Sequence, residues 1–444
     1  MTMADLRPAT GEMLIDVTRL LIRFIQGRLP TGVDRVCLSY IRRYGAFSRV
    51  VVFKAGLGCV FAKAASQRIF ELLMEPGEVF YRAAIRVMAT SPPMPLPGWR
   101  SAGRFLFNVG HSGLDHPEYA RWLVRKMVRP IFFVHDLTPI THPEFCRAGE
   151  SARHIARMRT ILTTGAGIVA NSIVTLDELS RFADASGWAM PPSIAAPLGC
   201  RLPNGDRASE VGGRVLGVGS RRPDIGYRKL EIGRRSPTSY SRSPIEGPYF
   251  VMLGTIEPRK NHWMALHVWR RLVERRGSAA PKLIIIGQRG WECENVLDLL
   301  ERSTLLRGVV SELPGCSDTE LVCRLRGARA LIFPSMDEGY GLPLVEALSL
   351  GVPVIAGDLP VFHEVAGNIP DYLDPLDGPG WISCIEDYCL PDSPLRRAQL
   401  ERLSGFVAPA WEDHFEAVDK LLGQIGVTLP FQAPTDRCGT MERL

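Results

Sequence analysis

The segment PSMDEGYGLPLVEAL, residues 334–348, decides the fold of this chain. Four apolar residues, 330–333, come directly before it and predict a short buried strand. Two glycines then predict a turn, and Pro343 stands where the first turn of a helix tolerates a missing amide hydrogen. A buried strand, a glycine turn and a helix form the repeating unit of a parallel α/β sheet.

Polar groups gather at this turn. Glu338 lies in the loop and Glu346 about one turn into the helix, so one carboxylate can meet a sugar ring while the other accepts hydrogen bonds from a ribose diol. The free amides of Gly341 and Leu342 would point out of the helix N-terminus toward a bound diphosphate. Two solvated surface glutamates are the alternative interpretation, but the strand, the glycines and the helix start together favour a binding site.

The same alternation extends over the whole chain. Strands are predicted at 13–17, 50–53, 105–109, 131–134 and 168–170 in the first half, and at 249–253, 283–286, 330–333 and 352–356 in the second. Residues 201–247 are rich in arginine, glycine, proline and serine and predict a connection between domains. We therefore expect two Rossmann-like, doubly wound parallel-sheet domains that face each other across a cleft.

The predicted domains are residues 1–205 and residues 248–405, with 206–247 as the linker. A helix follows in residues 406–426, and 427–444 form a tail. The pair Gly56 and Gly58 follows a strand, but no third glycine opens a helix, so we expect a plain loop there.

Composition limits the class of protein. The chain has 444 residues, 46% of them apolar, and a net charge of +6, as in a soluble globular protein with a mildly basic surface. Ten scattered cysteines without zinc-knuckle spacing predict a reduced chain, and no apolar run approaches the roughly 18 residues that span a bilayer. Acidic residues interrupt any N-terminal signal-peptide core, so we expect a cytoplasmic protein.

A pair of cations follows the first strand of the second half. The segment VMLGTIEPRKN, residues 251–261, ends a strand at Gly254 and continues to Arg259 and Lys260. Cations fixed at the end of such a strand can stabilise negative charge on a bound phosphate group. They would do so without a metal ion, and the chain contains no Asp-x-Asp sequence. Solvated loop charges are the alternative interpretation.

The Glu-x7-Glu element and the Arg-Lys loop resemble those of the retaining glycosyltransferases of family 4, which have the GT-B fold. Segments 283–291, 351–356 and 364–367 resemble the family as well. The resemblance implies sugar transfer with retention of anomeric configuration and a C-terminal helix that crosses back to the first domain. It implies that Glu338 faces the sugar, Glu346 the ribose, and Arg259 with Lys260 the diphosphate.

The first half adds two candidate positions. His135 follows an apolar strand and matches a histidine that the family carries near the donor sugar, whereas a structural histidine is the alternative interpretation. Thr31 and Gly32 resemble the family's N-terminal glycine loop, with Thr31 in place of the first glycine. We thus expect catalytic roles for His135, Glu338, Arg259 and Lys260, and donor contacts from Thr31, Gly32, Gly254, Arg259, Lys260, Glu338, Gly341, Leu342 and Glu346.

The partners follow from the resemblance. The loop resembles that of bacterial mannosyltransferases of surface polysaccharides, so GDP-mannose is the first choice of donor and a UDP-sugar the second. The acceptor would be a lipid-linked saccharide or a polysaccharide, met at the cytoplasmic face of the inner membrane, and the basic segment 121–129 could contact lipid. We expect no further cofactor, no metal and no nucleic acid. A GT-B epimerase, a phosphorylase and a non-catalytic nucleotide-sugar-binding protein remain alternatives.

Overall fold

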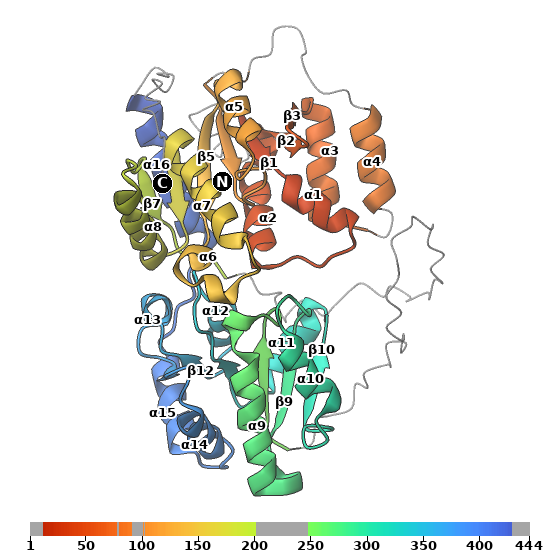
Figure 1. Ribbon diagram of the computed structural model, residues 1–444, viewed down its shortest axis with the longest axis vertical. Helices are drawn as coiled ribbons and strands as arrows, with labels where there is room; N and C mark the ends of the chain where they lie inside the picture. Colours follow the sequence, from red (N-terminus) through yellow and green to blue (C-terminus); the bar gives the residue numbers. More distant parts are fainter. Residues whose placement is uncertain (1–11, 78–79, 91–100, 102, 201–246, 429–444) are drawn as a thin grey trace.

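The structure, a computed structural model, describes residues 12–77, 80–90, 101, 103–200 and 247–428. It consists of two α/β units, each a sheet with helices packed on it (Figure 1). Nearly all of the predicted linker and tail, residues 206–246 and 429–444, lies outside the described residues.

The N-terminal unit contains a seven-stranded sheet in the order β3-β2-β1-β4-β5-β6-β7. All neighbouring strands are parallel except β2 and β3, which form an antiparallel hairpin at one edge. The elements are β1 (Met13–Asp16), α1 (Thr18–Ile25), α2 (Gly32–Tyr44), the 3₁₀ turn η2 (Gly45–Phe47), β2 (Ser48–Lys54), β3 (Leu57–Val60), α3 (Lys63–Met74), α4 (Phe80–Thr90), β4 (Phe105–Asn108), α5 (Pro117–Lys126), β5 (Arg129–Val134), α6 (Thr138–Thr141), η3 (Pro143–Phe145), α7 (Glu150–Thr164), β6 (Gly167–Ala170), α8 (Ile173–Ser186) and β7 (Ser193–Ala195).

The C-terminal unit contains a six-stranded, fully parallel sheet in the order β10-β9-β8-β11-β12-β13. Its elements are β8 (Tyr249–Leu253), η4 (Pro258–Lys260), α9 (His262–Arg276), η5 (Gly277–Ala279), β9 (Lys282–Ile286), α10 (Glu294–Arg302), β10 (Val310–Leu313), α11 (Asp318–Arg326), β11 (Leu331–Phe333), α12 (Leu342–Ser349), β12 (Val354–Gly357), α13 (Pro360–Ala366), β13 (Asp371–Leu373), α14 (Gly378–Tyr388) and α15 (Pro394–Leu403), followed by α16 (Trp411–Thr428).

All nine predicted strands are present, and the predicted pair of doubly wound domains is confirmed. The loop expected around Gly56 and Gly58 was wrong in part, because Gly58 lies inside the edge strand β3. The indole of Trp122 occupies the space where a side chain at position 58 would be, with a Cβ there only 2.3 Å from the ring. Gly58 therefore allows α5 to pack closely on the hairpin and does not form a turn.

Each sheet has a point at which the order of the strands reverses. In the N-terminal sheet this point lies between β1 and β4, and in the C-terminal sheet between β8 and β11. Open α/β sheets bind ligands in the crevice beyond the carboxyl ends of such a strand pair. The loop that carries Arg259 and Lys260 follows β8, and the loop that carries Glu338 follows β11, so the topology brings both loops to the same crevice.

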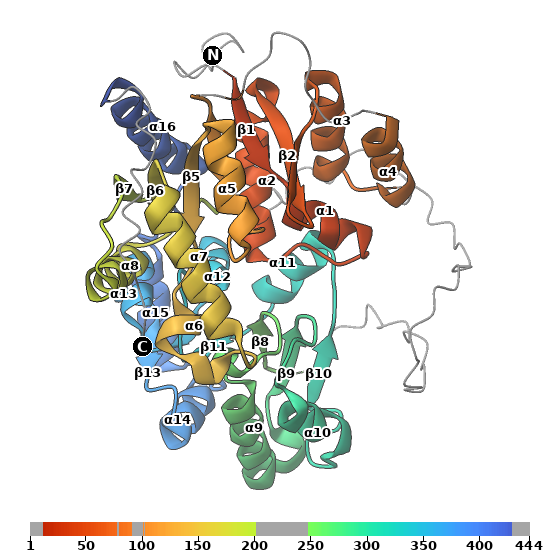
Figure 2. The same cartoon turned by 45° about the horizontal axis from the view of Figure 1, so that its top comes forward.

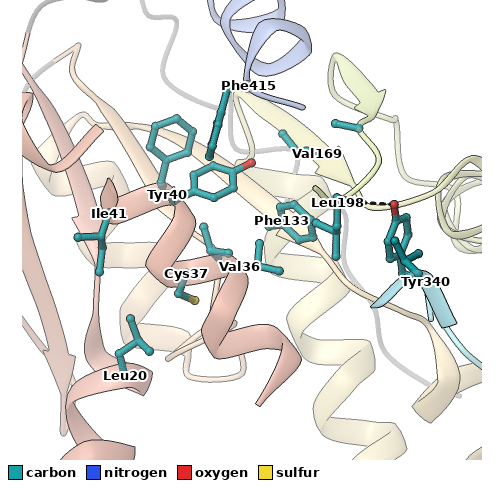
Figure 3. Packing of buried hydrophobic residues seen from close by; sticks show 14 of the residues in the cluster. Leu20, Val36, Cys37, Tyr40, Ile41, Phe133, Val169, Leu198, Tyr340 and Phe415 are labelled. Carbon is teal, nitrogen blue, oxygen red and sulfur yellow. Dashed lines mark hydrogen bonds between the residues drawn. The ribbon is translucent and has the colours of Figure 1, made fainter. Parts of the chain in front are cut away.

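Helix α16 returns to the N-terminal unit, where it packs against β6 and β7 (Figure 2). Phe415 of α16 makes an edge contact with the ring of Tyr40 in α2, their centroids 5.3 Å apart (Figure 3). The buried His414 contacts the carbonyl oxygen of Ala196 through Nδ1 at 3.0 Å and the Tyr40 hydroxyl through Nε2 at 3.1 Å. The end of the chain is thus part of the N-terminal core.

His414 makes stability depend on pH. Burial lowers its pKa to about 4, from an ordinary value of 6.5, so its stabilising contribution is complete above pH 6.5 and is lost as the pH falls toward 4. Between about pH 7.5 and about pH 4.5, the free energy of unfolding measured in urea should fall in both proteins. The fall should be roughly 2–3 kcal/mol larger in the wild type than in His414→Gln. Equal losses in the two proteins would contradict this assignment.

None of the helices in the described ranges is long and apolar enough to cross a lipid bilayer.

Candidate functional site

The centre of the site is a buried cluster in which one carboxylate meets two cations. Glu338 Oε2 lies 2.6 Å from Arg259 Nη1, and Glu338 Oε1 accepts hydrogen bonds from Lys260 Nζ and from the Ser335 hydroxyl, the latter at 2.9 Å. Glu338 and Lys260 are each less than one-tenth exposed. The two loops that the topology brings together are therefore joined by buried ion pairs.

Electrostatics fix the charges of this cluster. Burial alone would raise the pKa of Glu338, but Arg259 and Lys260 outweigh it and lower that pKa to about 2. Burial lowers the pKa of Lys260, although Glu338 opposes this effect. For Arg259, the charges of Glu338 and Glu257 outweigh burial and raise the pKa above its ordinary value. Glu338 is thus ionised and Arg259 is charged at neutral pH, and both basic side chains of the loop already have a carboxylate partner.

Several contacts hold the Arg-Lys loop, which follows β8 and carries Arg259 and Lys260, in place. Arg259 Nε contacts Glu257 at 2.7 Å, and its Nη1 donates to the backbone oxygen of Asp337 at 3.1 Å. Gly254 begins the loop with φ of 145°, a conformation that a side chain would strain. The Asn261 side chain donates to the carbonyl of Pro375 at 2.8 Å and closes the loop on the far side. Because of these contacts, Arg259 and Lys260 are preorganised before any ligand binds.

The loop that carries Glu338 also contacts the N-terminal unit. The carbonyl oxygen of Gly339 accepts hydrogen bonds from the hydroxyls of Ser172, at 2.9 Å, and Thr175, at 3.2 Å. A Cβ at position 339 would lie 1.8 Å from the carbonyl oxygen of His135, so only glycine permits this approach. The next residue, Tyr340, donates to the carbonyl of Leu198 at 2.8 Å (Figure 3). The Glu-x7-Glu segment therefore lies at the junction of the two units.

Glu346 contacts a residue of the opposite unit. Its carboxylate is buried and lies 2.6 Å from Arg35 Nη1, an ion pair between α12 and α2. Burial raises the pKa of Glu346, and Arg35 opposes that rise. Arg35 keeps 42% of its side chain exposed and also lies 3.4 Å from Asp318. Glu346 is thus buried and held by an ion pair whose arginine partner is partly exposed to solvent.

The N-terminal position that was expected to be a glycine loop is the start of a helix. Thr31 precedes α2 and forms a capping box with Asp34, whose carboxylate accepts from the Thr31 amide at 2.7 Å, and Gly32 is the first helical residue. The loop expectation was wrong for Gly32, because the cap at Thr31 lets the helix begin at that glycine. A Cβ on Gly32 would lie 3.4 Å from Leu342, so Thr31 and Gly32 stand beside the start of α12.

Helix α12 begins as expected. Gly341 is its N-cap with φ of 96°, Leu342 is its first residue, and Pro343 follows. The amide nitrogens at this end carry partial positive charge and follow the loop at the carboxyl end of β11.

His135 lies at the carboxyl end of β5 on the N-terminal side of the junction. Its Nε2 is 2.7 Å from the carbonyl oxygen of Val109, so Nε2 carries the hydrogen and Nδ1 is left as an acceptor. Burial lowers its pKa to about 4, so the ring is neutral at pH 7. His135 can accept a hydrogen bond from a hydroxyl group, but the neutral ring is not a general acid at pH 7.

The sequence did not reveal three residues of the site. Ser335 and Asp337 belong to segment 334–348, but a hydroxyl or carboxyl group in a loop carries no specific sequence signal. In the structure, Ser335 donates a hydrogen bond to Glu338, and Asp337 accepts one from the Thr138 hydroxyl. Arg35 is 311 positions from its partner Glu346, and only the folded chain brings them together.

Among the described residues, no three histidine, cysteine, aspartate or glutamate side chains are grouped so that they could hold a metal ion.

Comparison with known proteins finds a family match over the region that contains this site. Residues 240–369 match the family model "Glycosyl transferases group 1". The serotype-specific mannosyltransferase WbdA of Escherichia coli is 40% identical over 119 residues, which are 27% of this chain and 14% of WbdA. The O-antigen chain mannosyltransferase RfbU of Salmonella typhimurium is 32% identical over 164 residues, 36% of this chain and 42% of RfbU. The matched region is thus less than half the length of either relative.

A solved structure supports the fold over a longer range. The Anabaena protein HepE, solved in complex with UDP and glucose, is 13% identical to this chain with a TM-score of 0.59, over 93% of this chain and 100% of HepE. The matched region 240–369 contains both the Arg-Lys loop and the Glu-x7-Glu element. The chain therefore carries a glycosyl transferases group 1 domain on a GT-B fold.

Proposed function

We propose that the protein is a glycosyltransferase that moves a hexose from a nucleoside diphosphate sugar to a saccharide acceptor, with retention of configuration. The observation that carries the proposal is the buried cluster of Arg259, Lys260 and Glu338 at the strand-order reversal of the C-terminal sheet. Two preorganised cations at that place suit a leaving group whose negative charge grows during the reaction.

The donor would bind with its diphosphate against Arg259, Lys260 and the amide end of α12. Glu338 would give up part of its contact with the two cations and accept hydrogen bonds from the sugar hydroxyls. Glu346 would exchange Arg35 for the ribose hydroxyls. The nucleotide would thus lie across the end of the C-terminal sheet, with its sugar toward His135.

The chemical step would proceed on one face of the sugar. The bond from the anomeric carbon to the phosphate oxygen breaks, and its electron pair leaves with the nucleoside diphosphate, held by Arg259 and Lys260. The acceptor hydroxyl forms the new bond from the same face, and its proton passes to the departing phosphate oxygen. His135 would orient a hydroxyl through Nδ1, because its low pKa leaves it neutral at pH 7.

The donor and acceptor are proposed from the names of the relatives. WbdA and RfbU are called mannosyltransferases, so GDP-mannose is our first choice of donor and a UDP-sugar the second. RfbU is named for the O-antigen chain, so we propose a lipid-linked saccharide or polysaccharide acceptor in the synthesis of a bacterial surface polysaccharide. Such an acceptor would bring the protein to the cytoplasmic face of the inner membrane as a peripheral protein. On α5, Arg121 and Arg125 both pair with Glu118, so this one carboxylate offsets part of the charge of the two arginines.

A thermal-shift panel tests the proposal. The melting temperature should rise with one nucleoside diphosphate sugar and with its free nucleoside diphosphate, because both would contact the Arg-Lys loop, and should not rise with the free hexose. A panel of GDP- and UDP-sugars that leaves the melting temperature unchanged at millimolar concentration would argue against the donor site.

We also propose that transfer needs neither a metal ion nor another cofactor, since Arg259, Lys260 and the amide end of α12 supply the positive charge. A chelator should leave the initial rate of sugar transfer unchanged, measured before and after dialysis against EDTA. A full loss of activity that added Mn²⁺ or Mg²⁺ restores would contradict this mechanism.

A further inference from the structure

A small cavity lies in the C-terminal unit, at the amino end of β11 and so at the opposite end of that strand from the proposed donor site. Its volume is about 120 Å³, and it lies between the residue that leads into β11 and the start of α15. The donor residues follow the carboxyl end of β11, whereas Arg329 precedes the amino end of the same strand. Figure 1 shows α14 and α15 at the end of the C-terminal unit that is far from the N-terminal unit.

Three arginines line this cavity. Arg329 donates from Nε to the carbonyl of Tyr388 at 2.7 Å and from Nη2 to that of Leu390 at 2.8 Å, which secures the end of α14. Arg396 donates from Nε to the carbonyl of Arg329 at 3.1 Å. Arg397, which is exposed, also lines the cavity. Backbone carbonyls therefore fix two of the guanidinium groups while their remaining N–H groups stay available.

The positive charge of this cavity is not neutralised within the described part of the chain. No carboxylate there lies within ion-pair distance of any of the three guanidinium groups, although Asp392 stands on the lining. Burial, and after it the like charge of Arg329, lowers the pKa of Arg396, as expected where two cations share a site without a counter-charge. The neighbouring arginines 275 and 402, in contrast, each pair with an acid.

Size and geometry identify the kind of ligand. A cavity of about 120 Å³ is well below the roughly 300–1,000 Å³ of sites for drug-sized ligands, but it exceeds the roughly 30 Å³ share of a single water molecule. A planar guanidinium group can donate two parallel hydrogen bonds to two oxygens of one phosphate group. A halide ion has no such pair of acceptor atoms. We propose that Arg329, Arg396 and Arg397 form a binding site for one phosphate group, as inorganic phosphate or as a small phosphate monoester.

The site is separate from the proposed donor site, and its existence does not depend on the proposed sugar transfer. Calorimetry of the full chain tests it, with inorganic phosphate added at constant ionic strength in chloride. The wild type and Lys260→Ala should bind phosphate equally, whereas the double variant R396Q/R397Q should lose at least about ten-fold in affinity. Arg302→Gln, which removes an exposed arginine on α10, is the matched control and should bind as the wild type does.

Two further measurements make the result decisive. Arg397→Glu reverses the charge of an exposed side chain, so it should abolish binding while the melting curve stays unchanged. Glycerol phosphate that displaces inorganic phosphate would identify a phosphate-monoester site, whereas failure to displace it would identify free phosphate as the ligand. The proposal is overturned if R396Q/R397Q binds phosphate as tightly as the wild type, if Lys260→Ala alone abolishes binding, or if the wild type binds no phosphate.

Discussion

Lys260→Ala should lower the turnover of sugar transfer by roughly 100-fold, about 2.7 kcal/mol of transition-state stabilisation. The reason is the position of Lys260: it is buried, held beside Glu338 and packed over the ring of Phe333, with Nζ 5.0 Å from the ring centroid. A cation that is fixed before the reaction needs no reorganisation when charge develops on the leaving phosphate. Steady-state kinetics with the identified donor measure the effect.

The matched control is Lys420→Ala, which removes an exposed lysine that pairs with Glu416 on α16. Its turnover should equal that of the wild type. Arg259 still faces Glu338 in the Lys260 variant, so the carboxylate keeps one ion pair and the chain should remain folded. A folded Lys260→Ala protein with wild-type turnover would show that the Arg-Lys loop does not hold the donor phosphates.

The two glutamates should differ in their effects, because each has its own partners. Glu346→Gln should weaken the free nucleoside diphosphate and the intact donor alike by about 1–3 kcal/mol, since both ligands contain the ribose. Glu338→Gln should bind the free nucleotide at least as tightly as the wild type does. The reason is that the Glu338 carboxylate of the wild type pairs with both cations that the diphosphate requires. Its turnover should nevertheless fall, since the sugar loses a charged acceptor.

Calorimetry with the free nucleotide separates these cases, and kinetics then measure the turnover of Glu338→Gln. Glu416→Gln, a change at an exposed carboxylate of α16, serves as the control and should leave both binding and turnover unchanged. If both substitutions weakened the free nucleotide equally, or if only Glu338→Gln weakened it, the assignment of the ribose to Glu346 would be wrong.

The fold could be predicted because its signals are local. The strands that lead into the Arg-Lys loop and the Glu-x7-Glu element are short apolar runs, and the glycines after them are needed for the backbone conformations at 254 and 341. The strands that the sequence did not reveal, β3, β7, β10 and β13, have only three or four residues and lie toward the sheet edges. Their partly exposed residues give no continuous apolar pattern.

The contacts within the site could not be predicted because they join distant parts of the chain. Arg259 and Glu338 are 79 positions apart, and nothing local indicates that one neutralises the other. The sequence explains Gly339 as a turn residue. In the structure a side chain at this position would collide with the carbonyl oxygen of His135 in the other unit, which the local sequence does not indicate. The start of α2, in contrast, does have a local signal. Asp34 follows Thr31 at the three-residue spacing of a capping box, and this spacing would have identified the helix start.

Mass spectrometry of the reaction products tests the central claim most directly. The wild-type protein is incubated with the nucleoside diphosphate sugar that raises its melting temperature and with a lipid-linked saccharide acceptor. We expect one free nucleoside diphosphate for each acceptor molecule that gains a single hexose, and formation of both products at a roughly 100-fold lower rate in Lys260→Ala. Recovery of an epimerised donor, of a sugar 1-phosphate that forms only when phosphate is added, or of unchanged donor and acceptor would contradict the claim that this protein transfers sugars.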